Sequence, residues 1–143
     1  MGCKALLLAA AALVANPATG IEPGDGPDLR RCIEAARDAA AVAACEVTAQ
    51  AVFRERIARW SAAIEQRLPP RERILFVRNR EAWEAFLESE TALLDATLAA
   101  RRDGLAAHLR PGAVTRLLEQ RETQLREHLH NLSYGRGPDP AKP

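Results

Sequence analysis

The sequence predicts an all-α fold, a small helical bundle of about four helices with one disulfide near the N-terminus of the mature chain. Alanine is abundant and only 4% of the residues are aromatic, a composition that favours close-packed helices over a sheet. Apolar residues recur at steps of three and four in several stretches, and no stretch alternates as a strand would. Prolines and glycines separate these stretches, so the helices should be joined by short connections.

The chain begins with the pattern of a secretory leader. Lys4 carries a positive charge, an apolar run covers residues 5–15, and small residues stand at positions 18 and 20. We therefore expect residues 1–20 to be a signal peptide that is cleaved after Gly20. The apolar run is shorter than the roughly 20 residues that span a bilayer. The mature protein should then be periplasmic or secreted, without membrane insertion.

Cys32 and Cys45 are the cysteines that remain once Cys3 has left with the leader. In an oxidising compartment, two thiols on short neighbouring helical segments are most simply one disulfide. It would close a loop of about 14 residues, worth roughly 3 kcal/mol when the entropy of the unfolded chain is considered. The alternative, two buried free thiols, would suit a cytosolic protein better.

Composition sets the boundaries of the predicted domain. Residues 21–27 hold two prolines and two glycines and should form a flexible lead-in, and residues 134–143 should form a flexible tail. The helical domain is predicted to cover residues 28–133. Asp28 should cap a first helix and Asp38 a second, with a kink between the two helices that lets the disulfide form.

Three further segments complete the predicted bundle. Apolar steps indicate a helix with one buried stripe, formed by Val47, Phe53, Ile57, Trp60, Ile64 and Leu68. Pro69 and Pro70 should end it, and Pro70 suits the first turn of the next and longest helix. Gly104 offers a stop or bend, and Pro111 with Gly112 indicates a turn. A last amphipathic helix is predicted from position 114 to position 132.

Charge and motifs exclude several classes of function. Removing Lys4 from the 20 basic residues leaves as many as the 19 acidic ones, and such a neutral chain is not expected to bind nucleic acid. His128 and His130 are two residues apart and His108 is distant, whereas a helical metal pair needs a separation of four. No phosphate loop, nucleophile elbow or Cys-His constellation is present. We therefore expect no metal, no cofactor, no catalytic residue and no enzyme activity.

Two short motifs carry a resemblance to a known family. Ala82, Trp83 and Phe86 fit an Ala-Trp-x-x-Phe pattern, and residues 117–125 fit a closing helix in which Arg121 is the matching arginine. Together with a cysteine pair before a long helix, they resemble the LprI-type lysozyme inhibitor N-terminal family, from about position 29 to position 129. The family comprises exported bacterial helical domains.

The sequence also departs from the family pattern. Arg80 and Glu81 replace the usual Gln-Arg before the alanine, and Leu87 replaces the arginine after the phenylalanine. The resemblance implies that Cys32 and Cys45 are the family's first cysteine pair. Thr91 and Ala113 stand where a second pair is expected, and the joint loss of both cysteines leaves no odd thiol.

Trp83 and Phe86 should face the same way on the long helix, three residues apart. We expect them to be structural core residues, with Arg121 pairing across the bundle with a carboxylate of that helix. The alternative is a binding anchor, which would require an exposed tryptophan.

An acidic stripe follows along the same helix, formed by Glu81, Glu84, Glu88 and Asp95. A basic partner, such as a lysozyme-like protein, would be attracted to this stripe. The alternative is a solvated helix face with local pairs, for instance Arg80 with Glu84.

The resemblance implies an exported, non-catalytic binding protein that inhibits a lysozyme-like muramidase by covering its cleft. We further expect a turn at residues 110–112 to enter that cleft. One alternative is a periplasmic envelope-stress or chaperone-like helical protein with an exposed apolar face. Another is a structural module that oligomerises through alanine-rich helices. The sequence does not choose among them, and it leaves the oligomeric state open.

Overall fold

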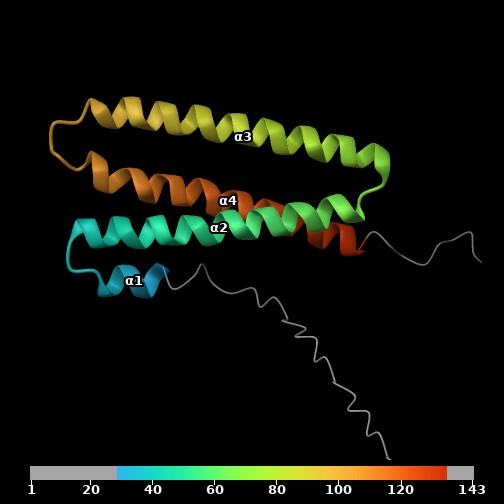
Figure 1. Ribbon diagram of the computed structural model, residues 1–143, viewed down its shortest axis with the longest axis horizontal. Coiled ribbons are helices and arrows are strands. Elements are labelled where there is room, and N and C mark those ends of the chain that lie inside the picture. Colours follow the sequence, from blue (N-terminus) through green and yellow to red (C-terminus); the bar gives the residue numbers. More distant parts are fainter. Residues whose placement is uncertain (1–28, 135–143) are drawn as a thin grey trace, which may run out of the picture.

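The computed structural model describes residues 29–134, and within them the chain forms four helices and no strand. This confirms the predicted all-α bundle with its disulfide (Figure 1). The helices are α1 (Leu29–Ala35), α2 (Ala39–Arg67), α3 (Pro70–Ala99) and α4 (Ala106–Tyr134). The expected leader and lead-in lie outside the described residues, as does Asp28. The expected tail also lies outside them, except for Tyr134, which ends α4. None of the four helices is both long and apolar enough to cross a membrane.

The short helix α1 is tethered to the beginning of α2. The side chain of Asp38 accepts a hydrogen bond of 2.8 Å from the backbone nitrogen of Ala41, so Asp38 caps α2 as predicted. The bend before it brings Cys32 and Cys45 to a Cα–Cα distance of 5.8 Å, and the two form the disulfide. Helix α1 buries none of its own residues, although Leu29 packs against the core. Its position therefore depends largely on the disulfide.

Helices α2 and α4 form the packed centre of the bundle. They run in the same direction, and α3 returns antiparallel to both (Figure 1). One core cluster joins Ala49 and Phe53 of α2 to Val114 and Leu118 of α4. A second cluster joins Ile64, Phe76 and Leu125, and thus holds the beginning of α3.

Helix α3 is packed much less tightly than its neighbours. Phe76 is its only buried residue, although Trp83, Leu87 and Leu94 pack against the first core cluster while partly exposed. Four large apolar side chains of α3 are exposed, those of Ile74, Leu75, Phe86 and Leu93. One side of this 30-residue helix thus contacts the bundle, and the rest faces outward.

The predicted turn at Pro111 and Gly112 is wrong, because both residues lie inside α4. The turn lies earlier, where Gly104 has a positive φ of 72°. Pro111 removes one backbone donor, but its carbonyl oxygen accepts a hydrogen bond of 2.9 Å from Nε2 of Gln50 in α2. A Cβ on Gly112 would lie 3.3 Å from Oε1 of Glu46, so glycine lets the two helices approach closely. Contacts between helices therefore override the local turn preference.

Val47 does not belong to the buried stripe of α2, since it is 56% exposed. The stripe begins instead at Cys45 and continues through Ala49 and Phe53 at steps of four. The physical reason is the helical period, because six residues separate Val47 from Phe53 and place the two side chains well apart around the helix.

Candidate functional site

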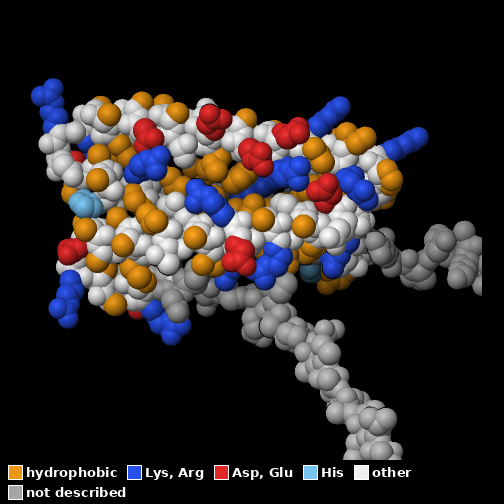
Figure 2. Space-filling view, in the orientation of Figure 1, with side chains coloured by type: hydrophobic (Ala, Val, Ile, Leu, Met, Phe, Trp, Pro, Cys, Tyr) orange, Lys and Arg blue, Asp and Glu red, His pale blue; other side chains and the backbone are white. Residues whose placement is uncertain are grey.

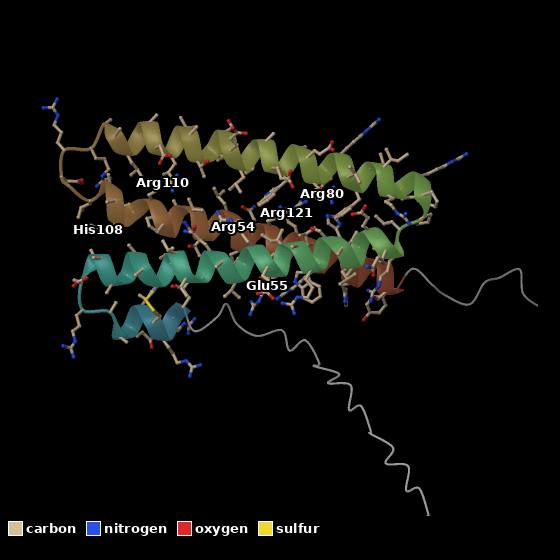
Figure 3. All side chains as sticks on the ribbon, in the orientation of Figure 1. Arg54, Glu55, Arg80, His108, Arg110 and Arg121 are labelled. Carbon is tan, nitrogen blue, oxygen red and sulfur yellow. A yellow bond between two sulfur atoms is a disulfide. The ribbon has the colours of Figure 1, made fainter. Side chains whose placement is uncertain are left out.

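An open groove of about 610 Å³ lies between α2 and α3. Leu118 and Arg121 of α4 contribute to its lining, and Trp83 and Leu87 come from α3. Figure 3 shows Arg54, Arg80 and Arg121 between α3 and the other two long helices. The remaining lining residues are Ile57, Ala58, Ser61, Ala62, Glu65, Glu81 and Glu84. The groove exists because α3 is held along a narrow line of contact, which leaves the space beside that line unfilled.

Arg121 is the most buried charged residue of the groove, with 3% of its surface exposed. Its Nη2 donates a hydrogen bond of 2.9 Å to Oδ1 of Asn79, and its guanidinium carbon lies 5.2 Å from the centroid of the Trp83 ring. Nε is buried without a hydrogen-bond partner. Burial lowers the pKa of Arg121, while the charge of Glu84 acts in the opposite direction.

These contacts correct the expectation for Arg121. It reaches across to the long helix, but its hydrogen bond is to the amide of Asn79 and not to a carboxylate. Glu84 affects it only as a nearby charge. The structural role of Arg121 therefore depends on Trp83 and Asn79, both within the motif segment at residues 79–86.

Trp83 and Phe86 differ in their surroundings. Trp83 is half-buried, packs against the first core cluster and lines the groove. Phe86 is 48% exposed and belongs to neither cluster, so its assignment to the core is wrong. A separation of three residues turns a side chain by about 60° around the helix, which suffices to carry Phe86 off the narrow line of contact.

The acidic stripe divides into two parts. Glu81, Glu84 and Glu88 are exposed and form no ion pair within residues 29–134. Asp95 instead accepts hydrogen bonds of 2.5 and 3.0 Å from Nε and Nη2 of Arg110, which lower the pKa of Asp95. Arg110 thus binds α4 to α3 and is not in a turn that could enter an enzyme cleft.

Figure 2 shows acidic side chains along α3 and basic side chains between α3 and the helices below it. The local pair expected between Arg80 and Glu84 does not form. Arg80 lies 3.3 Å from Oε2 of Glu65 in α2, a partner 15 residues away. The carboxylates of Glu81, Glu84 and Glu88 are therefore available to another molecule.

Sequence reasoning missed several residues of this site, chiefly Asn79, Glu65 and Arg54. Asn79 lies within the motif segment and could have been considered as a partner of Arg121. Glu65 and Arg54 carry no comparable signal, because their proximity to α3 depends on how the helices pack and not on local spacing.

No group of three histidine, cysteine, aspartate or glutamate side chains that could hold a metal ion occurs in the described part of the chain. His128 and His130 are exposed on α4, and the ring of His130 contacts Tyr134 with 4.6 Å between centroids. What the groove offers is recognition by charge and by an aromatic surface, since Trp83 and Arg121 lie beside unpaired carboxylates.

No family model matches the chain, and no match was found among curated proteins or solved structures. Fold and groove together define a class, that of a helical protein with a disulfide-tethered first helix and an open, charged groove beside its outermost long helix.

Proposed function

We propose that this protein is an exported, non-catalytic binding protein of the LprI-like type, and that it inhibits a lysozyme-like muramidase. The observation that carries the proposal is the acidic flank of α3, where Glu81, Glu84 and Glu88 lie unpaired beside Trp83. Charges without an internal partner raise the encounter rate with a basic protein and orient it. A half-buried tryptophan beside them is the kind of side chain that anchors an interface.

Inhibition in this proposal is steric. A basic enzyme is drawn to the acidic flank, and α3, about 45 Å long at 1.5 Å per residue, lies across the cleft and excludes substrate. The disulfide and the secretory leader predicted from the sequence support an exported location, since disulfides persist in oxidising compartments.

The first experiment measures muramidase activity on cell walls with the oxidised chain from residue 21 to residue 143. Several classes of lysozyme are tested, and the reduced, denatured protein serves as the control. We expect dose-dependent inhibition of at least one class that disappears on denaturation. Full enzyme activity with every class would refute the proposal.

A charge-reversed variant tests the surface. Glu81→Lys with Glu88→Lys should raise the inhibitory concentration by roughly tenfold or more, because attraction becomes repulsion. Glu119→Lys with Glu127→Lys on α4 makes the same change of net charge on another helix and should stay close to the wild type. Equal inhibition by the two double variants would show that α3 is not the inhibitory surface.

A second candidate function is a chaperone-like role in the envelope. It is favoured by the exposed apolar side chains of Ile74, Leu75, Phe86 and Leu93 on α3, which could bind unfolded chains. Suppression of aggregation of several unrelated clients, with no effect on any lysozyme, would support this candidate over the first.

A further inference from the structure

The charges of α3 are segregated along the helix, with basic side chains at its beginning and acidic ones further on. Residues 70–80 hold four arginines and one glutamate, whereas residues 81–99 hold five acidic side chains and no basic one. The helix dipole acts only within the first and last turns, so it disfavours Arg71 and Arg73 but does not affect the acidic side chains of the helix interior. Glu65 and Arg110 compensate Arg80 and Asp95.

Arg71 and Arg78 are exposed and form no ion pair in the described part of the chain. The same holds for Glu81 and Glu88. The basic beginning and the acidic remainder of α3 thus each keep charged side chains that have no partner among residues 29–134, and the two stretches are complementary to each other.

A largely apolar strip lies on the same helix, away from the groove. It consists of Leu75, Ala82, Phe86 and Leu93 together with the small polar residue Ser89, and we name it the outer seam. Leu75 and Leu93 are 64% and 59% exposed, although each would favour burial. Leu75, Ala82 and Ser89 follow one another at steps of seven, as do Phe86 and Leu93. This is the repeat by which two helices pack side by side.

We propose that the outer seam binds the outer seam of a second copy of this chain, with the two α3 helices antiparallel in a two-fold symmetric dimer. With Leu75 opposite Leu93 of the second copy, Phe86 lies opposite Ala82, so that the largest side chain of the seam meets a small one. In this register Arg78 lies opposite position 90, and Arg71 opposite position 97, within the acidic stretch of the other helix.

A second copy is the occupant that the charges specify. Antiparallel pairing places each basic end beside an acidic stretch, while parallel pairing would place like charges together. A two-fold interface also requires a patch that is complementary to itself, which a helix with opposite charges at its two ends provides. The dimer leaves the groove open, because Trp83 and Leu87 point toward the bundle, roughly a quarter to a third of a turn around α3 from the outer seam.

The inference extends beyond the proposed inhibition and does not depend on it. Sedimentation of the oxidised protein measures its oligomeric state across a range of micromolar concentrations, with no lysozyme present. We expect a reversible monomer–dimer equilibrium that weakens as salt is added. A monomer at every concentration would overturn the proposal.

Substitutions in the outer seam test the location. Phe86→Ser with Leu93→Ser should raise the dissociation constant roughly a hundredfold, because each copy loses two apolar contacts. Both side chains are exposed, so circular dichroism should show an unchanged fold. A dimer of undiminished strength would place the interface on another face.

A charge exchange tests the antiparallel arrangement. Arg78→Glu should weaken the dimer by roughly tenfold, and adding Glu88→Arg in the same chain should largely restore it, since position 88 lies roughly half a turn from the residue opposite position 78 and opposite charges then lie close together again. Arg126→Glu on α4 is the matched control and should have little effect. If Arg78→Glu leaves the dimer unchanged, or Glu88→Arg does not restore it, the antiparallel pairing is wrong.

Discussion

The charged side chain of Arg121 is buried between the helices, and no carboxylate is hydrogen-bonded to it. Its compensation comes from the amide of Asn79, the ring of Trp83 and the more distant charge of Glu84. Burying an ion costs several kcal/mol, which such contacts offset only in part. We therefore expect Arg121 to stabilise the bundle through the packing of its side chain more than through its charge.

This expectation separates two substitutions of Arg121. Arg121→Met keeps most of the side-chain volume and removes the charge, so the free energy of unfolding should change by less than about 1 kcal/mol or increase. Arg121→Ala leaves a cavity beside Leu118 and should lower the free energy of unfolding by about 2 kcal/mol. Urea unfolding measures both values. If methionine is as damaging as alanine, the charged contacts outweigh the cost of burial.

Asp95 makes the stability of the protein depend on pH. Its pKa is lowered by the hydrogen bond from Arg110, so its ionised form is favoured in the folded state. The stabilisation is present above the pKa of the unfolded chain and is lost as the pH falls through the lower folded pKa.

Wild-type protein should therefore lose more stability than Asp95→Asn between about pH 5 and pH 2, and the two should converge at the acidic end. Because Asp95 and Arg110 are both about half exposed, the effect should be small and should shrink in salt. Thermal unfolding of both proteins across this pH range measures the difference in stability. Parallel curves for the two proteins would show that the ion pair contributes nothing.

At the scale of whole helices, the boundaries set by neighbouring residues could be predicted from the sequence. Asp38 caps α2, Pro70 begins α3, and Gly104 lies in the connection to α4. Each depends on backbone geometry within a few residues. The pair Pro111 and Gly112 could not be interpreted in this way, because its role inside α4 depends on Gln50 and Glu46 of α2.

The disulfide should matter more for α1 than for the rest of the bundle. Cys32→Ser with Cys45→Ser should lower the free energy of unfolding by about 3 kcal/mol, and α1 should detach because it buries none of its residues. Urea unfolding and amide exchange of residues 29–35 measure the two effects. A reducing agent should reproduce them in the wild type and leave the variant unchanged. A tightly held α1 in the variant would contradict the tethering role.

For the molecule as a whole, the sequence did not reveal how unequally the three long helices are buried. Trp83, Leu87 and Leu94 of α3 follow one another at steps of four and seven and so share one face of the helix, as Ala49 and Phe53 of α2 do at a step of four. Periodicity identifies the side that faces inward, but it does not show how closely a helix approaches its neighbours. The groove and the exposed position of Phe86 both depend on how closely α3 approaches its neighbours, so the sequence did not predict them.

The central claim is that α3 serves contact with other molecules more than it serves the core of its own chain. Hydrogen–deuterium exchange of the oxidised protein tests it helix by helix. At low micromolar concentration, amides of α3 should exchange faster than those of α2 and α4, because fewer of its side chains are buried. Their protection should increase at higher concentration or when an inhibited lysozyme is added. Equal protection of all three helices, unchanged under either condition, would contradict the claim.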